Sequence, residues 1–451
     1  MVLISMSSWL HGVQVAMPDS SDHVDAEIID LTHDGKGIAD IDGHRVFVSG
    51  ALPGEFVRVA PRYRRRRYQE AKLVEVLRAA ETRVAPPCPY FGRCGGCAVQ
   101  HLTYTAQVEF KEAVVREALA RIAGTEPDEW LGPLTGPEWY YRRRARFGVR
   151  FVAGKNRVLV GFKERATRFI TDMSNCRVLV EPLESLPGEL ATLIDRTTLK
   201  KRTPQVECAV GESARAIVLR VLDEPTEEDS RLYREFGQQH DMDVYLQRGG
   251  PGTVRALDPA TTKSLDYSLP EFGITLEFTP TDFLQVNARI NEAIVGRTVE
   301  LLGVESSDRV LDLYCGLGNF SLPLASRAAK MLGVEGEAGL VARAARNARR
   351  NDLANARFIT ADLSETEWSF TRESWDLVVL DPPRSGAHAA VTQMARMGPR
   401  RIAYVSCHPA TLARDAKELI GSQGYRLQAA GIADMFPHTH HVEAMALFER
   451  R

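Results

Sequence analysis

Three cysteines lie within ten positions of one another in the segment PCPYFGRCGGC. Cys88, Cys94 and Cys97 are separated by five and then two residues, in a chain of 451 residues that contains seven cysteines. An odd number of cysteines, scattered over a long chain without an export signal, argues against a disulfide framework. Thiols grouped this closely are typical metal ligands, and their spacing alone leaves structural zinc and an iron–sulfur cluster both open.

A different cysteine, Cys407, follows the predicted strand RIAYVS and directly precedes a predicted helix. The positive end of a helix stabilises a thiolate, so Cys407 is a candidate nucleophile. A thiolate that adds to carbon 6 of a uracil activates carbon 5 for methylation, after which a base must remove the carbon 5 proton. Glu443, at the start of the last predicted strand, is the candidate base. The alternatives are an ordinary buried thiol for Cys407 and a surface carboxylate for Glu443.

A glycine turn and three acids indicate a nucleotide-type cofactor site. The predicted strand in VLDLYCGLGNFSL runs into Gly316 and Gly318, and Glu335 ends the next strand. Serine occupies the place of the third glycine of the dinucleotide fingerprint, which favours a ligand without a pyrophosphate, such as S-adenosylmethionine (SAM). Asp362 and Asp381 end two further predicted strands. The alternative is a plain tight turn between strand and helix.

The elements that must hold these residues fall into three predicted domains. Residues 22–80 consist of short strands separated by Gly and Asp turns, which predicts a small closed OB-like barrel. Residues 81–272 combine a helix with mixed strands in a central α+β domain. Residues 273–451 alternate strands with helices and end in two consecutive strands, which predicts a Rossmann-like α/β domain with a seven-stranded, mostly parallel sheet. We expect residues 1–21 to form a disordered extension.

The composition is that of a globular protein, with 44% hydrophobic and 26% charged residues and a net charge of −2. No apolar run approaches the roughly 20 residues of a membrane span. The first residues lack the basic start and apolar core of a secretory signal. We therefore expect a cytoplasmic protein with no membrane partner and no obligate protein partner, acting as a monomer.

Two segments combine arginines with aromatic residues, RVAPRYRRRRYQE and WYYRRRARFGVR. Arginine binds phosphates and aromatic rings stack on bases, which is the combination that single-stranded or looped RNA requires. The alternative for each segment is a solvated strand face. Two such segments favour RNA binding.

The segments DLYCGLGNFSL, DPPRSG, SCHPATLARD and FPHTHHVE, in this order and at these distances, resemble the family of SAM-dependent RNA uracil-5-methyltransferases. The resemblance covers nearly the whole chain. The N-terminal barrel resembles a TRAM domain, and CPYFGRCGGCAVQH resembles the iron–sulfur segment of members that act on large-subunit ribosomal RNA. Among these, the chain most resembles the members that form 5-methyluridine at uracil 1939 of 23S rRNA. The implied partner is a single-stranded or looped uracil of that RNA.

The resemblance also implies roles for individual residues. Cys407 would be the nucleophile and Glu443 the base. The implied SAM contacts are Gln285 (in TPTDFLQVN), Tyr314, Asn319, Glu335, Asp362 and Asp381. For the cysteines it implies a 4Fe–4S cluster rather than zinc, with the ligands Cys88, Cys94, Cys97 and Cys176. Because methyl transfer involves no net electron change, we expect the cluster to be structural and to shape an RNA-binding surface near WYYRRRARF.

Two other classes of function remain open from the sequence. An iron–sulfur redox enzyme acting on RNA would use the nucleotide fold for a flavin or a nicotinamide. A non-catalytic RNA-binding factor would keep the fold but would not bind SAM. Within the methyltransferase hypothesis, the same chemistry could act on another ribosomal uracil.

Overall fold

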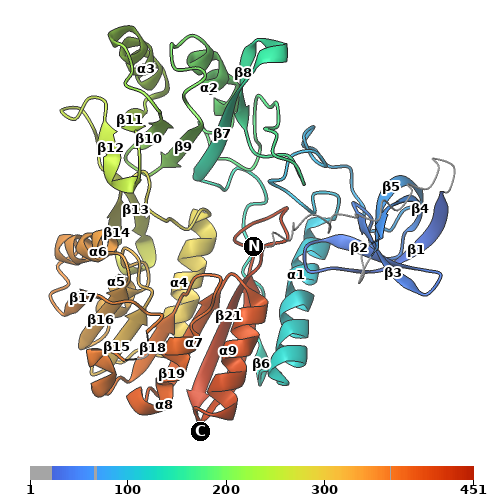
Figure 1. Ribbon diagram of the computed structural model, residues 1–451. Coiled ribbons are helices and arrows are strands. Elements are labelled where there is room, and N and C mark those ends of the chain that lie inside the picture. Colours follow the sequence, from blue (N-terminus) through green and yellow to red (C-terminus); the bar gives the residue numbers. More distant parts are fainter. Residues whose placement is uncertain (1–22, 65–68, 366) are drawn as a thin grey trace, which may run out of the picture. The chain divides into compact units, whose positions relative to one another are not determined.

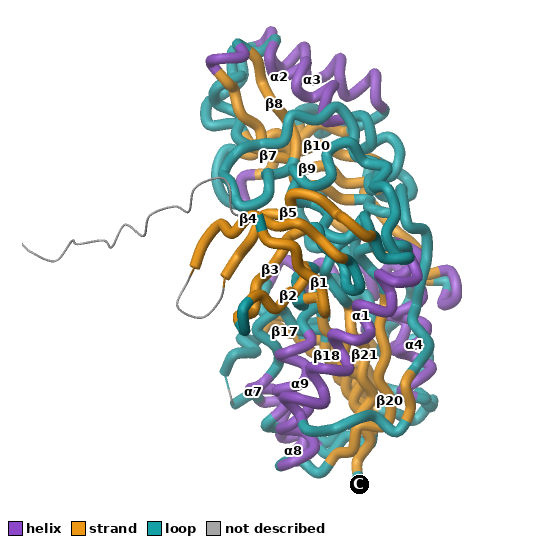
Figure 2. The backbone as a smooth tube through the Cα atoms, turned by 90° about the vertical axis from the view of Figure 1, so that its right-hand side faces the viewer, coloured by secondary structure: helices purple, strands orange, loops and turns teal. Residues whose placement is uncertain are grey.

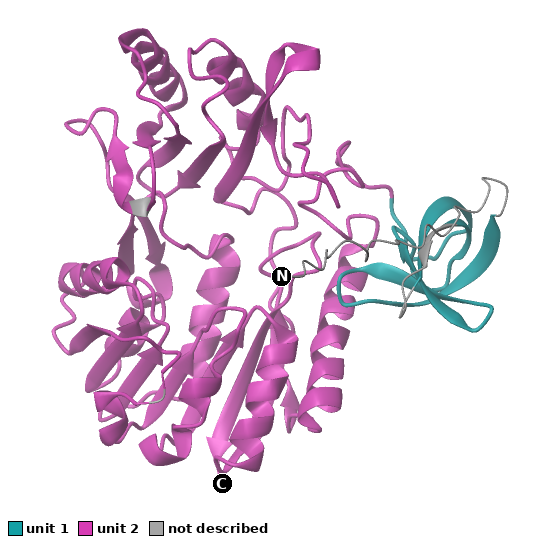
Figure 3. Ribbon diagram, viewed as in Figure 1, with its two compact units in different colours: residues 1–84 teal, residues 85–451 magenta. Residues whose placement is uncertain are grey.

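The computed structural model describes residues 23–64, 69–365 and 367–451. The predicted N-terminal extension, residues 1–21, and residues 65–68 of the first arginine-rich segment lie outside the described residues. The chain divides into two compact units, residues 1–84 and residues 85–451 (Figure 3).

The first unit is a closed barrel with the strand order β1-β2-β3-β5-β4. Its strands are β1 (Val24–Leu31), β2 (Lys36–Ile41), β3 (His44–Ser49), β4 (Phe56–Arg64) and β5 (Gln69–Arg78). Alternate side chains point inward, so that Ile28, Val46 and Val57 are fully buried. Asp42 and Gly43 both have positive φ angles in the turn between β2 and β3, as a tight hairpin turn requires. The predicted barrel is confirmed.

The second unit contains a six-stranded sheet at the top of Figure 1, with the order β12-β11-β10-β9-β7-β8. The strands are β7 (Arg144–Val152), β8 (Arg157–Gly161), β9 (Gln205–Val210), β10 (Arg215–Arg220), β11 (Asp243–Gln247) and β12 (Val254–Ala256). The helices α2 (Leu186–Asp195) and α3 (Glu227–His240) pack against it through a shared apolar core. The hairpin of β13 (Leu265–Leu269) and β14 (Ile274–Phe278) follows in the chain.

The larger sheet carries the predicted site residues and has the order β17-β16-β15-β18-β19-β21-β20-β6. Its strands are β6 (Glu129–Trp130), β15 (Arg309–Leu313), β16 (Lys330–Glu335), β17 (Ala356–Thr360), β18 (Leu377–Leu380), β19 (Arg401–Ser406), β20 (Tyr425–Ala433) and β21 (Glu443–Arg450). Strands β15 to β19 are parallel, and β21 runs antiparallel to both of its neighbours. The predicted methyltransferase-type sheet is therefore present.

Helices cover both faces of this sheet. Residues of α4 (Ala288–Leu302), α5 (Ser321–Ala325) and α6 (Ala338–Arg350) share one apolar core with it. Residues of α1 (Tyr104–Ala118), α7 (His388–Val391), α8 (Met394–Met397) and α9 (Pro409–Gly421) share a second core on the other face. Figure 2 shows α9 and α4 on opposite sides of the strands. A sheet buried on both faces explains why its central strands are continuously apolar.

The sheet has eight strands where we predicted seven, and the additional strand is β6. After α1 the chain runs along the free edge of β20, and Leu131 N–H donates to the Ala430 carbonyl at 2.8 Å. This pairing satisfies backbone groups that an edge strand would otherwise expose. A strand of two residues has no periodicity to detect in the sequence. Both β6 and α1 were predicted in the central domain but pack on the larger sheet.

In the part of the chain that the structure describes, no helix combines the length and the apolar character needed to cross a bilayer.

Candidate active site

The turn after β15 brings the backbone to the carboxyl edge of the sheet. Tyr314, Gly316 and Gly318 all have positive φ angles, a conformation that glycine adopts at little cost. Glu335, at the end of β16, accepts a hydrogen bond from the Gly316 N–H at 3.1 Å through Oε2 and one from the Gly336 N–H at 2.7 Å through Oε1. The turn and the acid therefore hold each other in place, as a nucleotide-type site requires.

Asn319 is fixed by two residues that the sequence did not single out. Its Oδ1 accepts from the Tyr267 hydroxyl at 2.9 Å and from Asn291 Nδ2 at 3.0 Å, and its Nδ2 donates to Asn291 Oδ1 at 2.9 Å. The Arg143 guanidinium lies over the Tyr267 ring, and its Nε donates to the Gln285 carbonyl at 3.2 Å. This chain of contacts connects Gln285 to Asn319.

Two acids at this edge are buried enough to resist ionisation. Burial raises the pKa of Asp312, inside β15, to about 8, and that of Asp381, after β18, to about 7. The Ser321 hydroxyl donates to Asp312 at 2.5 Å. Asp312 was not among the predicted site residues, although an acidic residue inside the apolar run VLDL is a recognisable sign of a functional position. Acids held partly neutral by burial become anionic readily when a cationic ligand arrives.

Asp362 and Tyr314 complete the row of strand ends. Asp362 is exposed and accepts hydrogen bonds from the Ser364 N–H at 2.9 Å and hydroxyl at 2.7 Å, which lower its pKa. The Tyr314 hydroxyl donates to the Leu363 carbonyl at 3.5 Å. The structure thus places Tyr314, Glu335, Asp362 and Asp381 at the carboxyl ends of the adjacent strands β15 to β18, where open parallel sheets bind ligands.

The candidate nucleophile and base lie side by side at the same edge. In the antiparallel pair of β19 and β21, Ser406 is opposite Ala444, so the next position of this register places Cys407 opposite Glu443. Leu380 pairs with Tyr404 in β19, which brings Asp381 to the neighbouring strand end. The pKa of the Cys407 thiol is raised to about 11, mostly by burial and in part by the charges of Glu443 and Asp381, while Arg384 opposes the shift.

Glu443 is buried, with 3% of its surface exposed. Burial raises the pKa of its carboxyl well above the ordinary value, and the charge of Asp381 adds to this effect. As a carboxylate, Glu443 is therefore a stronger base than an exposed glutamate.

The loop of the DPPRSG segment is tied to α9 through Asp415, which the sequence reasoning also missed. Asp415 Oδ2 accepts from the Ala387 N–H and from the Tyr404 hydroxyl, each at 2.7 Å. Gly386 has a φ of +81°, and a Cβ there would stand 2.5 Å from Arg414 Nη2. These contacts set the position of Asp381 relative to Cys407.

The four predicted metal ligands lie around the same cavity. Cys88, Cys94, Cys97 and Cys176 line one cavity of about 140 Å³, and none of them is in a disulfide. Burial raises the pKa of Cys97 to about 11 and that of Cys176 to about 12. Among the described residues no three His, Cys, Asp or Glu side chains are grouped tightly enough to form a site for a metal ion. The donor set, four unpaired thiols around one cavity, fits a thiolate-bound cluster in its chemistry.

The second arginine-rich segment serves mainly the protein's own contacts. Arg143 is buried, and Arg144 and Arg146 both form ion pairs with Glu207, at 2.9 and 3.0 Å. Tyr140 remains 44% exposed. The Arg146 side chain also remains 64% exposed, so the segment keeps a surface-exposed part beside its internal contacts.

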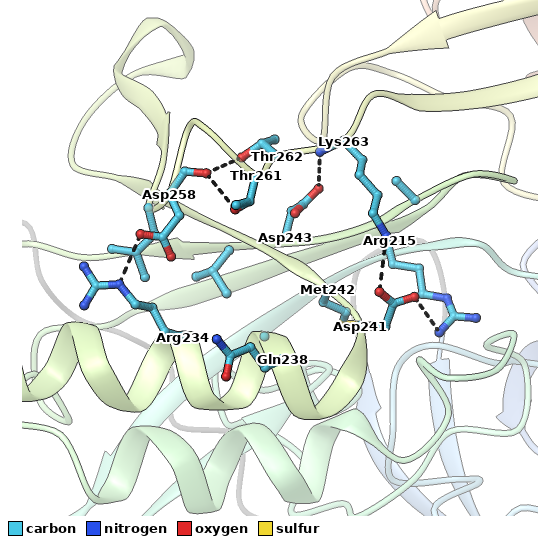
Figure 4. A pocket seen from close by; sticks show the side chains of 14 residues that line it. Arg215, Arg234, Gln238, Asp241, Met242, Asp243, Asp258, Thr261, Thr262 and Lys263 are labelled. Carbon is cyan, nitrogen blue, oxygen red and sulfur yellow. Dashed lines mark hydrogen bonds and ion pairs between the residues drawn. The ribbon is translucent and has the colours of Figure 1, made fainter.

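A separate pocket of about 200 Å³ lies between α3, residues 241–244 and residues 257–263 (Figure 4). Its cations are compensated by acids of the same pocket: Arg234 pairs with Asp258 at 3.1 Å, and Lys263 pairs with Asp241 at 3.4 Å. None of the predicted site residues lines it.

Known proteins resemble this chain over most of its length. The model of the tRNA (uracil-5-)-methyltransferase family matches residues 103–451, and that of the TRAM domain matches residues 22–74. A 23S rRNA (uracil(1939)-C(5))-methyltransferase RlmD from Nitrosococcus oceani is 49% identical, over 96% of this chain and 97% of that protein. Proteins of the same name from Alkalilimnicola ehrlichii and Thiobacillus denitrificans are each 48% identical, over 94% of this chain and 96% and 99% of theirs.

The fold matches a solved structure as well. The crystal structure of Pyrococcus abyssi tRNA (uracil-54, C5)-methyltransferase in complex with S-adenosyl-L-homocysteine superposes with a TM-score of 0.72, at 24% identity, over 94% of this chain and 99% of that one. At this identity the likeness concerns the fold alone. The family model covers well over half of the chain, and the relatives align over nearly all of it. The chain therefore belongs to the tRNA (uracil-5-)-methyltransferase family.

Proposed function

We propose that this protein transfers the methyl group of SAM to carbon 5 of a uracil in 23S ribosomal RNA, namely uracil 1939, the position for which its relatives are named. The observation that carries the proposal is that Cys407 and Glu443 lie one position beyond the last paired residues of β19 and β21, at the sheet edge that also holds the glycine turn. A thiol beside a buried carboxyl suits a reaction that needs both a nucleophile and a base.

In the proposed reaction the Cys407 thiolate adds to carbon 6 of the uracil, which makes carbon 5 nucleophilic. SAM, when bound, supplies the methyl group that carbon 5 accepts. The Glu443 carboxylate then removes the carbon 5 proton, the double bond re-forms and the bond from sulfur to carbon 6 breaks. Cys407 leaves as a thiolate, and Glu443 holds the proton. A target uracil must leave its stack to reach Cys407.

The proposed contacts to SAM are those of the glycine turn and its neighbours. Glu335, at the tip of β16, suits the ribose hydroxyls, and Asp381 faces the reacting end. Gln285, Tyr314, Asn319 and Asp362 complete the set. The positive sulfonium favours the ionised form of nearby acids, which burial would otherwise keep neutral.

We further propose that Cys88, Cys94, Cys97 and Cys176 hold a 4Fe–4S cluster. The shared cavity of these four unpaired cysteines supports this proposal. Protein purified without oxygen should contain about four iron atoms and about four acid-labile sulfides per chain. Cys176→Ser should lower both, whereas Cys208→Ser, which changes a buried thiol outside the cavity, should not. One zinc per chain and no iron would contradict the cluster.

The proposal also covers which domains act on the RNA, where in the cell the protein acts and its oligomeric state. The barrel of residues 22–80, the cysteine-bearing region of residues 81–272 and the methyltransferase domain of residues 273–451 would act together on single-stranded or looped RNA. We propose that the protein does so in the cytoplasm, as a monomer.

The nucleophile can be tested by trapping. RNA containing 5-fluorouracil at the target position should form a complex that survives denaturing electrophoresis, because fluorine blocks the elimination step. Cys407→Ala should abolish this complex, and Cys208→Ala should form it normally. If Cys407→Ala still formed the complex, the nucleophile would be another residue. Loss of 5-methyluridine at one 23S position in cells lacking the protein would identify the target.

A further inference from the structure

The loop between β20 and β21, residues 434–442, leads directly into Glu443, and we call it the base loop. Much of its backbone is bound by groups from an earlier part of the chain. The Ala98 and Val99 N–H groups donate to the His438 carbonyl at 2.8 and 3.0 Å, the Tyr141 hydroxyl donates to the Pro437 carbonyl at 3.0 Å, and Lys111 Nζ donates to the Phe436 carbonyl at 2.9 Å.

Gln107 of α1 makes the most specific contact to this loop. It is 1% exposed, and its Oε1 accepts from the His438 N–H at 2.8 Å while its Nε2 lies 3.3 Å from His438 Nδ1. His438 has a φ of +67°, and its ring stacks on Trp139 at 3.7 Å between centroids. A residue other than glycine keeps this backbone conformation only where its surroundings impose it.

A buried ion pair fixes the first residues of the base loop. Lys111 Nζ lies 2.5 Å from Asp434 Oδ1, and neither side chain has any exposed surface. The attraction within such a pair is largely offset by the loss of hydration, so the pair is a weak source of stability. Its directional contacts instead define where the loop lies, because the same ammonium also binds the Phe436 carbonyl.

The cysteine cavity shares a wall with the base loop. Ala98 and Val99 directly follow Cys97, and Thr439 of the base loop lines the cavity together with Trp139 and Tyr141. A change in the cysteine segment therefore reaches the base loop through hydrogen bonds and direct packing. Cys407 and Asp381 follow the paired strands β19 and β18, and the base loop touches that side of the site through His441, whose Nδ1 lies 3.2 Å from Arg384 Nη2.

We propose that Gln107, Lys111 and Tyr141 are positioning residues for Glu443, and that the cysteine segment, residues 88–99, supports the removal of the carbon 5 proton through them. The proposal rests on the proposed function, because it requires Glu443 to act as the base. A base works only within hydrogen-bonding reach of its proton, and a misplacement of about 1 Å slows a reaction by about 100-fold. Addition of Cys407 and methyl transfer do not use Glu443, so those steps should be spared.

The experiment follows one turnover of an RNA fragment carrying the target uracil with radiolabelled SAM. Two quantities are measured, the methyl group transferred and the fraction of methylated RNA still linked to the protein. Gln107→Leu should transfer the methyl group within about twofold of the wild-type rate but release the RNA about tenfold more slowly. Tyr141→Phe, which deletes one hydroxyl, should slow release by a smaller factor. Gln239→Leu, on the exposed side of α3, is the matched control.

The pH dependence of release is a second readout. A loosened base loop admits water to Glu443 and lowers its raised pKa, so the midpoint of release should move to lower pH in Gln107→Leu. A loss of stability alone would not move this midpoint.

The proposal would be overturned if Gln107→Leu and Tyr141→Phe both released the RNA at the wild-type rate. It would also be overturned if methyl transfer and RNA release were slowed by the same factor. If Gln107→Leu does not fold, Tyr141→Phe decides the question. If the wild-type protein transfers no methyl group to uracil, the proposed function fails, and this inference fails with it.

Discussion

The substitution Glu443→Gln removes a buried carboxyl group from beside the Cys407 thiol and keeps the size of the side chain. Two effects of opposite sign should follow. The thiol should ionise more easily, because a negative neighbour that raises its pKa is gone. The carbon 5 proton should remain in place, because an amide does not accept it. The variant should therefore form the covalent adduct at least as fast as the wild-type protein and then stall.

The size of the first effect is an order-of-magnitude estimate. Opposite residues in antiparallel strands have Cα atoms about 5 Å apart, and with side chains of unequal length we take a charge separation of about 7 Å. At an effective dielectric constant of about 20, like charges at this distance repel by about 2.4 kcal/mol, or almost two pKa units. Cys407 is partly exposed, and solvent screening reduces the effect to about one unit. The second effect, loss of the general base, is typically about 10²- to 10⁴-fold.

The first effect is measured as the rate of Cys407 alkylation against pH, with Cys407→Ala to subtract the other cysteines. The midpoint should fall by about one unit relative to the wild-type protein, because the carboxylate that raises the thiol pKa is gone. The second effect is measured as the fraction of methylated RNA that stays linked to the protein. Glu449→Gln is the matched control, because Glu449 lies at the far end of the same strand.

Normal turnover of Glu443→Gln would show that another group removes the proton. An unchanged or higher alkylation midpoint would refute the placement of the carboxyl beside the thiol. Either result would contradict the proposed roles of Cys407 as the nucleophile and Glu443 as the base.

Two further predictions concern stability. Gly386→Ala should lower the free energy of unfolding by about 1–3 kcal/mol, because Gly386 has a positive φ and the added Cβ would collide with Arg414. Gly154→Ala is the control, because a Cβ at that position meets nothing within 4 Å. In denaturant it should unfold like the wild-type protein. Asp308→Asn should cost about 1 kcal/mol at pH 7 and progressively less below the ordinary aspartate pKa, because Arg400 lowers the pKa of Asp308 and this stabilisation is lost as the pH falls through the lowered value. An equal cost above and below that pKa would rule out the ion pair as its source.

Much of the fold was readable from short stretches of sequence. Alternating apolar residues predict the barrel strands, and a buried strand that runs into Gly316 and Gly318 predicts the cofactor turn. These patterns are local, because side-chain periodicity and turn geometry depend on residues a few positions apart.

The sequence was less informative where the same residue type serves two purposes. The arginines of WYYRRRARF were interpreted as phosphate ligands, but Arg143 is buried against Tyr267 and the partly buried Arg144 pairs with Glu207. Composition does not distinguish an arginine that binds RNA from one that pairs within the protein, because both use the same guanidinium. Likewise Asn291 lies in no motif, and Asp415, although it ends the motif SCHPATLARD, has a role that exists only when α9 packs beside the site.

The sequence by itself determined the strand and helix types, the glycine turn and the motifs that led to a uracil methyltransferase and to four candidate cysteine ligands. Only the tertiary structure decided which of these groups meet. Cys176 reaches the other three cysteines across one cavity, and Lys111 binds Asp434 across 323 positions of chain. Such contacts depend on how helices and strands pack, and packing brings together residues whose separation in the sequence carries no signal of their proximity.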